Sequence, residues 1–210
     1  MNIPTKITVS RIVLIGIMLI GLLVIGFIPN FPEVYLGNST ISLVYFVCFC
    51  VFVIAALTDK LDGYLARKWN QVTDLGKFLD PVADKLLVDS CLIFLSVPNF
   101  IAPNNIVIPV FCTIVMILRD LVVDSLRFIA AGKGQVLAAN IFGKIKTVCQ
   151  MVAIPLFFLN DWPFSYFDAN WGYGRLSYIF MFIATFASLL SGVIYVVQNR
   201  SVFKEDKKNG

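Results

Sequence analysis

Long apolar stretches separated by short polar segments dominate the chain. A helix needs about 17–25 mainly apolar residues to cross a bilayer, and the stretches, together with their flanks, approach that length. The pattern therefore predicts an all-α, polytopic membrane protein with six transmembrane helices. The expected spans are Thr8–Ile28, Ser42–Leu57, Leu86–Val97 with an upstream extension, Ile106–Leu118, Gly143–Leu159 and Ser177–Val197.

The first apolar stretch is too long for a signal peptide, and no small-residue cleavage site closes it before Pro29. We expect it to remain as a membrane anchor. No internal repeat or long linker divides the chain, so residues 1–210 are expected to form a single membrane domain.

Composition agrees with this class of protein. With 210 residues, 59% of them apolar, and a mean hydropathy of +0.84, the chain has more apolar surface than one soluble core can bury. It has no histidine, which excludes imidazole bases, His-ligated zinc and Ser–His or Cys–His nucleophile pairs. Its five cysteines lie singly in apolar runs, so we expect neither disulfides nor a cysteine metal cluster.

The basic residues are distributed unevenly between alternate connections. The expected outer connections, around 29–41, 98–105 and 160–176, contain Arg175 as their one basic residue, whereas the inner segments are rich in Lys and Arg. Because basic residues are retained on the cytoplasmic side, we expect both termini to be cytoplasmic.

Four aspartates lie at the inner ends of the second and third expected helices. An ionised carboxylate facing lipid costs several kcal/mol, so these side chains should face each other or a cation. Two of them are spaced i, i+3 and two i, i+4, so each pair shares one helix face. Oxygen ligands favour hard cations such as Mg²⁺ or Mn²⁺. The alternative is that they are aspartates at helix ends that pair with neighbouring lysines. The four residues are Asp59, Asp62, Asp80 and Asp84.

These aspartates belong to one longer motif. Residues 59–84 read D-x-x-D-G-x-x-A-R, eight residues, G-x-x-x-D-x-x-x-D. This resembles the signature of the CDP-alcohol phosphatidyltransferase family, with every defining position filled. The resemblance implies a cofactor of two divalent cations, Mg²⁺ or Mn²⁺, held by all four aspartates, with Asp84 as the catalytic proton acceptor. It also implies a homodimer that transfers a phosphatidyl group from CDP-diacylglycerol to an alcohol, releasing CMP at the cytoplasmic face of the bacterial cytoplasmic membrane.

Other residues of the motif suit the donor lipid. Small side chains after the aspartates leave space for a nucleotide, although close helix packing would explain them equally well. The arginine of the motif can bind phosphate oxygens through two parallel hydrogen bonds. Hydroxyls near the start of the chain and before the third helix occupy positions that resemble donor contacts in the family. The expected CDP-lipid-binding residues are Thr5, Thr8, Gly63, Ala66, Arg67 and Thr73.

A second basic group lies on the fourth and fifth expected helices. So many cations suit an acceptor that already carries a phosphate, whereas ordinary positive-inside charge explains Lys133 better. Segments 119–127 and 138–147 look most like those of bacterial family members that use sn-glycerol 3-phosphate. Two positions depart from that subgroup, which usually has Asn at Thr5 and Glu at Asp120. The expected acceptor-phosphate ligands are Arg119, Arg127, Lys144 and Lys146.

Three alternatives remain open at this stage. The acceptor could be inositol phosphate, or phosphatidylglycerol in a cardiolipin-forming enzyme. An ion-coupled transporter also uses membrane carboxylates, but it predicts acids near the bilayer midplane and inverted repeats, neither of which the sequence contains. A non-catalytic scaffold leaves the aspartate spacing unexplained. No nucleic-acid partner is expected.

Overall fold

The computed structural model describes residues 2–28, 34–36, 41–69, 73–98, 105–135, 137–138, 140–164 and 175–200, without the side chains of 3, 4, 60–62, 64–67, 74 and 77. Helices account for most of these residues, which confirms the all-α prediction. Tyr35 and Ser42 form an isolated β-bridge, and the described residues contain no longer strand. The helices are α1 (Ile3–Phe27), α2 (Leu43–Lys68), α3 (Asp74–Ser96), α4 (Val110–Gly132), α5 (Ile141–Phe158) and α6 (Leu176–Gln198).

Several helices extend beyond the boundaries that hydropathy predicts. Helix α2 continues past Leu57, and α4 continues well past Leu118. The predicted start of α4 is wrong, because Pro109 caps the helix and the residues before it are not helical. Hydropathy detects only the apolar part of a helix, so polar ends are missed. These polar ends carry most of the candidate site.

Three of the described helices are long and apolar enough to cross a bilayer by length and composition. They comprise Thr5–Phe27 of α1, the whole of α5 and the whole of α6. The apolar part of α2, Leu43–Asp59, is shorter. The chain is therefore a membrane protein, and its six-span topology stays a prediction.

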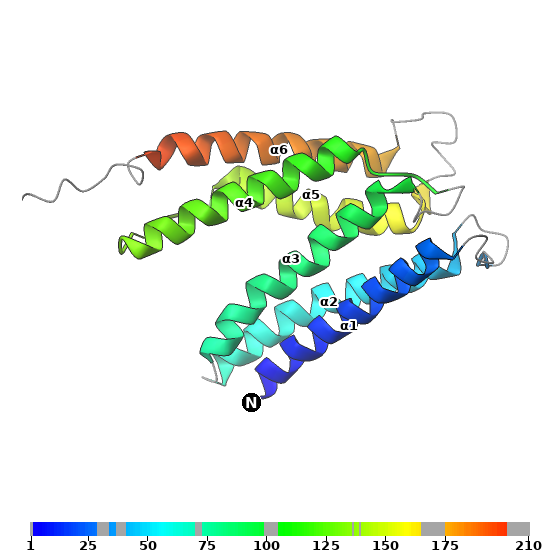
Figure 1. The fold of residues 1–210 in the computed structure, drawn as a ribbon, viewed down its shortest axis with the longest axis horizontal. Helices are drawn as coiled ribbons and strands as arrows, with labels where there is room; N and C mark the ends of the chain where they lie inside the picture. The colour runs from blue at the N-terminus through cyan, green and yellow to red at the C-terminus, as the bar shows by residue number, and fades with distance from the viewer. Residues whose placement is uncertain are drawn as a thin grey trace, which may run out of the picture.

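The helices form two sets that diverge from a common end (Figure 1). Helix α1 packs against α2 and α3, while α4 and α5 pack against α6. The two sets are joined where α3 meets α4 and α5, and where α2 meets α5. The N-terminus of α3 and the C-termini of α2, α4 and α6 lie at the end where the sets separate, which we call the open end.

The main hydrophobic core holds the opposite end together. It draws buried residues from all six helices, among them Ile15, Phe52, Leu92, Met116 and Phe157. A smaller cluster of Val123, Leu126 and Tyr195 joins α4 to α6 nearer the open end. The five cysteines are all unpaired in the structure.

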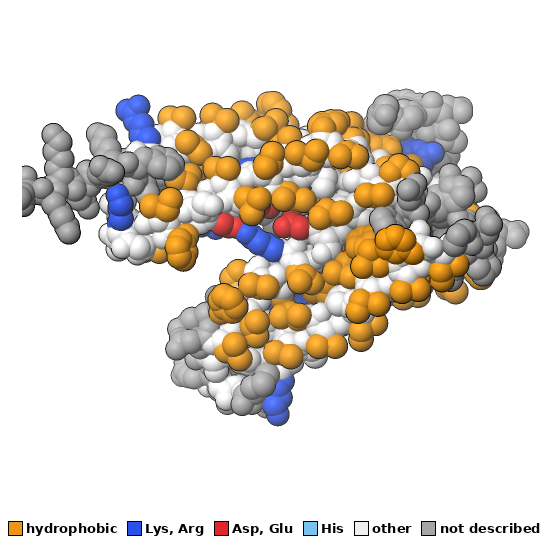
Figure 2. Space-filling view, viewed as in Figure 1, with side chains coloured by type: hydrophobic (Ala, Val, Ile, Leu, Met, Phe, Trp, Pro, Cys, Tyr) orange, Lys and Arg blue, Asp and Glu red, His pale blue; other side chains and the backbone are white. Residues whose placement is uncertain are grey.

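Figure 2 shows a hollow between the two helix sets, with acidic and basic side chains exposed at its closed end. Apolar side chains cover most of the remaining described surface in this view. The acidic side chains visible in this view lie beside the hollow, whereas Lys and Arg side chains also lie at the far ends of the bundle.

Candidate active site

An arginine of α1 joins two of the motif aspartates. The Arg11 guanidinium forms a close ion pair with Asp59 of α2 through Nη1, and its Nη2 lies 3.9 Å from Oδ1 of Asp80 on α3. The Arg11 side chain is only 2% exposed, whereas those of Asp59 and Asp80 are 30% and 45% exposed. A buried guanidinium is costly unless it is paired, so the two carboxylates stabilise it. One cation thus links three helices at the open end.

Threonines of α1 complete the contact with α3. The Thr8 hydroxyl donates a hydrogen bond to Oδ1 of Asp80 at 3.1 Å. The hydroxyls of Thr5 and Thr73 share a hydrogen bond with an Oγ1–Oγ1 distance of 2.9 Å. Thr5, Thr8 and Arg11 are each almost completely buried. Because they are spaced at i, i+3 and i, i+6, they follow one face of α1 toward the motif.

Thr73 also explains why α3 begins where it does. Its backbone is extended, and its Oγ1 accepts a hydrogen bond from the Gly76 backbone nitrogen at 3.1 Å, so it is the N-cap of α3. This cap fixes the first turn of the helix that carries Asp80 and Asp84. A Cβ at Gly76 would lie 3.1 Å from the Thr73 Oγ1, so glycine suits this close approach.

The remaining motif residues are placed less closely together. Asp84 is exposed one turn beyond Asp80 on α3, and Gly63 is half-buried one turn beyond Asp59 on α2. The side chains of Asp62, Ala66 and Arg67 lie outside the described residues. Of the three described aspartates, the structure therefore brings Asp59 and Asp80 to one cation, and Asp84 follows one turn further along α3.

The donor atoms fit a hard divalent cation. They are all oxygens, and the exposure of Asp59 and Asp80 leaves carboxylate surface open to a ligand that Arg11 and Thr8 do not cover. Among the described side chains, no three His, Cys, Asp or Glu residues form a group that could hold a metal ion. The side chain of Asp62, which lies between Asp59 and Asp80 in the motif, is outside the described residues.

A second charged cluster joins α4, α5 and α6. Oδ1 of Asp120 accepts a hydrogen bond from Arg119 Nη1 at 2.9 Å, and its Oδ2 forms a close ion pair with Lys146. Arg119 Nη2 donates to the Ser191 hydroxyl. The cluster therefore already supplies one anion to two of the cations that were assigned to the acceptor phosphate.

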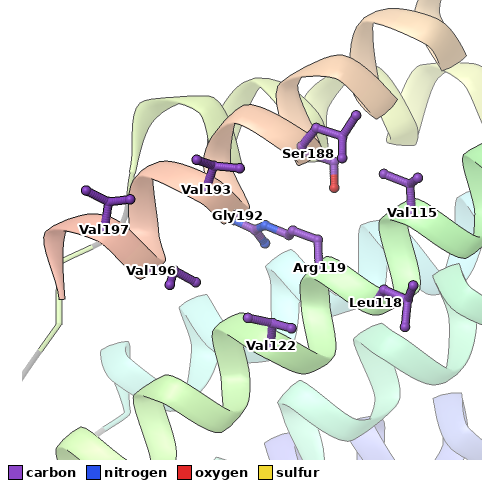
Figure 3. Close-up of a pocket in the computed structure, with 10 residues that line it drawn as sticks. Val115, Leu118, Arg119, Val122, Ser188, Gly192, Val193, Val196 and Val197 are labelled. Atoms are coloured by element: carbon purple, nitrogen blue, oxygen red, sulfur yellow. The ribbon is translucent and has the colours of Figure 1, made fainter. Parts of the chain in front are cut away.

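Glycines make room for the Arg119 side chain. A Cβ at Gly143 would lie 2.9 Å from Arg119 Nη2, and a Cβ at Gly192 would lie 3.1 Å from its Cγ. Figure 3 shows Arg119 reaching from α4 toward Gly192 of α6, beside a cavity of about 410 Å³ whose other walls are mainly valine and leucine. Arg119 thus occupies a narrow slot between helices.

The other predicted acceptor ligands are not in this cluster. Arg127 is exposed, its Nε donates to the Tyr195 hydroxyl at 3.1 Å, and its Cζ lies 5.6 Å from the centroid of the Tyr195 ring. Lys144 is exposed near the start of α5. A separate ion pair between Lys85 and Asp124 connects α3 to α4, with side chains 43% and 40% exposed.

The slot leads to a stability prediction for Gly143→Ala. Replacing glycine by alanine inside a helix normally stabilises it by about 1 kcal/mol. Here the new methyl group would displace a guanidinium that Asp120 and Ser191 hold, and such overpacking costs about 1–3 kcal/mol. We expect the melting temperature in detergent to fall or stay unchanged. Gly16→Ala in α1 is the matched control, because a Cβ there would meet nothing within 4 Å, and it should raise the melting temperature. A rise of equal size in both variants would contradict the slot.

Two residues of the site were not assigned from the sequence. Arg11 received no role in the site, although an arginine inside an apolar span is itself a signal of a buried partner. Asp120 was noted as a departure from the subgroup at the position of the Arg119 partner, and its contact with Lys146 was not expected. Its distance of one turn, i, i+4, from Asp124 gave no indication of which of the two is buried, and only the packing of α5 distinguishes them.

The chain is similar to known proteins over most of its length. The chain is 37% identical over 203 residues to the CDP-diacylglycerol--glycerol-3-phosphate 3-phosphatidyltransferase of Bacillus subtilis, covering 97% of both chains. It is 39% identical over 173 residues to the protein of that name from Mycoplasma pneumoniae, covering 78% of this chain and 71% of the relative. The Escherichia coli protein of that name is 37% identical over 155 residues, with 73% and 74% coverage. The sequence profile of the CDP-alcohol phosphatidyltransferases matches residues 1–194, so the chain belongs to the CDP-alcohol phosphatidyltransferase family.

Proposed function

We propose that this protein transfers the phosphatidyl group of CDP-diacylglycerol to sn-glycerol 3-phosphate, giving phosphatidylglycerophosphate and CMP. The observation that carries the proposal is the near full-length similarity to relatives that bear the name of this activity, with 97% of both chains aligned in one case. The complete aspartate motif and the convergence of Asp59 and Asp80 support it.

The chemistry is a displacement at phosphorus. The primary hydroxyl oxygen of the acceptor forms a bond to the lipid-side phosphorus, the bond from that phosphorus to the oxygen of CMP breaks, and CMP leaves with that oxygen. The hydroxyl proton passes to a carboxylate oxygen of Asp84, which is exposed on α3. Asp59, Asp62, Asp80 and Asp84 would hold two Mg²⁺ or Mn²⁺ ions. When bound, these ions would neutralise the charge that builds up on the phosphate oxygens.

The chain's own residues arrange this site. Thr8 and Arg11 contact Asp80, and the cap at Thr73 fixes the start of the helix that carries it. Thr5 contacts Thr73 and would lie beside the bound donor. Gly63, Ala66 and Arg67 follow on α2, where the small side chains would admit the nucleotide and the arginine would bind phosphate oxygens.

The acceptor is assigned to the second cluster. Arg119 and Lys146 of that cluster, together with Lys144 and Arg127 outside it, would provide positive charge for its phosphate. We place the protein in the bacterial cytoplasmic membrane with six spans, cytoplasmic termini and an active site facing the cytoplasm, since the basic residues gather on that side. We also propose that two copies of this chain form a homodimer.

The test is an assay of CMP release by the purified protein with CDP-diacylglycerol and Mn²⁺ or Mg²⁺. Parallel reactions receive sn-glycerol 3-phosphate, inositol phosphate, phosphatidylglycerol or free glycerol. We expect release with sn-glycerol 3-phosphate and little with the others. Efficient use of another acceptor would change the assigned substrate, and no release with any acceptor would refute the transferase proposal.

Arg11 gives a test of the metal site that does not depend on turnover. In Arg11→Met, Asp59 and Asp80 lose their shared cation, so the melting temperature in EDTA should fall by a few degrees, at roughly 2–4 °C per kcal/mol for a chain of this size. Added Mn²⁺ should then raise it more than in the parent, because the ion replaces the missing charge. Lys6→Met, an exposed cation on the same helix, should behave like the parent. An unchanged Mn²⁺ response in Arg11→Met would contradict metal binding by these two aspartates.

A further inference from the structure

Asp120 occupies a particular place in the second cluster. Each of its two carboxylate oxygens contacts a different cation, Oδ1 that of Arg119 on α4 and Oδ2 that of Lys146 on α5. Its side chain is 16% exposed, and those of Arg119 and Lys146 are 14% and 6% exposed. One nearly buried carboxylate therefore connects two nearly buried cations on adjacent helices.

Neither cation has another carboxylate in direct contact among the described ion pairs. Arg119 places its Nη2 on the neutral Ser191 hydroxyl, and its Nε is buried without a hydrogen-bond partner in the described part of the chain. Asp89 of α3 interacts with Lys146 and Asp120 only through the longer-range electrostatic field. Buried charges that lose their one contact partner are strongly destabilised or move toward water. The positions of both cations therefore depend on Asp120.

The surrounding helices restrict Arg119 further. Its stem passes Gly192 of α6 and its head lies against Gly143 of α5, so the side chain has little freedom to find a second position. Its head donates one N–H of Nη1 to Asp120 and one N–H of Nη2 to Ser191. Since a guanidinium has five N–H groups, the buried Nε–H and one N–H on each terminal nitrogen remain for an anion. The geometry is that of a preorganised cation whose orientation is fixed before any substrate arrives.

We propose that Asp120 is a positioning residue for the acceptor site, holding Arg119 and Lys146 in the arrangement that receives the phosphate of the acceptor. The role rests on the function proposed above. Asp120 makes no contact with substrate in this role. It sets the orientation of one cation through Oδ1 and the location of the other through Oδ2, so its loss affects the acceptor and leaves the donor site at Asp59 and Asp80 intact.

The experiment compares Asp120→Asn, Asp120→Glu and Asp124→Asn in the CMP-release assay. Asp124→Asn is the matched control, because it makes the same chemical change one turn along α4, in an ion pair that is about 40% exposed. In Asp120→Asn we expect the KM for sn-glycerol 3-phosphate to rise by about tenfold or more, with the KM for CDP-diacylglycerol within about twofold of the parent. Asp120→Glu should recover part of the loss, and Asp124→Asn should change neither KM more than about twofold.

A double variant keeps the test valid if Asp120→Asn folds poorly. Asp120→Asn with Lys146→Met removes the carboxylate together with one buried cation, so its melting temperature should recover. Its acceptor KM should exceed that of Lys146→Met alone, because Arg119 still loses its contact with Oδ1 of Asp120. It should stay below the product of the two single effects, because the contact between Asp120 and Lys146 is lost only once. Multiplied effects, or equal rises of both substrate KM values in Asp120→Asn, would overturn the positioning role. Absence of CMP release in the parent would instead refute the proposed function itself.

Discussion

Replacing Asp80 by asparagine is expected to lower CMP release by more than a hundredfold. Asp80 accepts the Thr8 hydroxyl hydrogen bond at 3.1 Å and lies 3.9 Å from Arg11, so asparagine would keep its size but lose the charge that both contacts orient. Loss of groups that merely support metal ligands already costs about 10–100-fold in other metalloenzymes, and loss of a ligand should cost more. The measurement is the rate of CMP release at saturating CDP-diacylglycerol and Mn²⁺.

Asp59→Asn should behave in the same way, because Asp59 shares the Arg11 guanidinium with Asp80. Asp124→Asn provides the control for a lost carboxylate elsewhere in the bundle, and it should retain nearly full turnover. A melting curve for each variant separates loss of chemistry from loss of folding. Undiminished turnover in Asp59→Asn and Asp80→Asn would rule out a metal site built on these two residues.

The sequence predicted the helical class well, because a stretch of twenty apolar residues has few alternatives to a membrane helix. The helix ends were predicted poorly. Residues 58–68 of α2 and 119–132 of α4 remain helical although they contain several charged side chains, because α-helical hydrogen bonding does not depend on side-chain hydropathy. Since functional side chains gather at these ends, hydropathy alone gives least information where the site lies.

The site itself was predicted unevenly for a similar reason. The spacing of the aspartates predicted that Asp59 shares a helix face with Asp62, and Asp80 with Asp84, and that the four face each other or a cation. In the structure, Asp59 and Asp80 both lie near the Arg11 guanidinium. Spacing within a helix says nothing of which third helix covers that face. Arg11 reaches the pair from α1, far away in sequence, and only tertiary packing shows it.

The acceptor cluster shows that a count of cations along the sequence also misses their partners within the protein. Counting cations on α4 and α5 predicted a site that lacks an anion, yet Asp120 provides one to Arg119 and Lys146. Arg127 belonged to the same count, but in the structure it contacts Tyr195. A sum of charges along the sequence therefore overestimates the positive charge that is available to a substrate.

The fate of the acceptor proton gives the second large expected effect. The chain has no histidine, so a carboxylate or a metal-bound hydroxide has to receive this proton. Asp84 is one turn beyond Asp80 and exposed, which lets a hydroxyl approach it. Asp84→Asn should therefore keep CDP-diacylglycerol binding but lose turnover. Asp62→Asn, by contrast, should lose metal binding and donor binding together.

Thermal-shift titrations of both variants with Mn²⁺ and CDP-diacylglycerol, run beside the CMP assay, separate the two roles. If Asp84 acts as a base, CDP-diacylglycerol should raise the melting temperature of Asp84→Asn as much as that of the parent, while turnover disappears. The proton is lost only when the new bond to phosphorus forms, so donor binding does not require the base. Substitution of a residue that holds the ion, such as Asp62, should abolish both the Mn²⁺ response and the response to CDP-diacylglycerol. If Asp84→Asn remains active, another group accepts the proton. If Asp84→Asn loses the Mn²⁺ response as completely as Asp62→Asn, Asp84 is a metal ligand only, and the attacking hydroxyl gives its proton to another group.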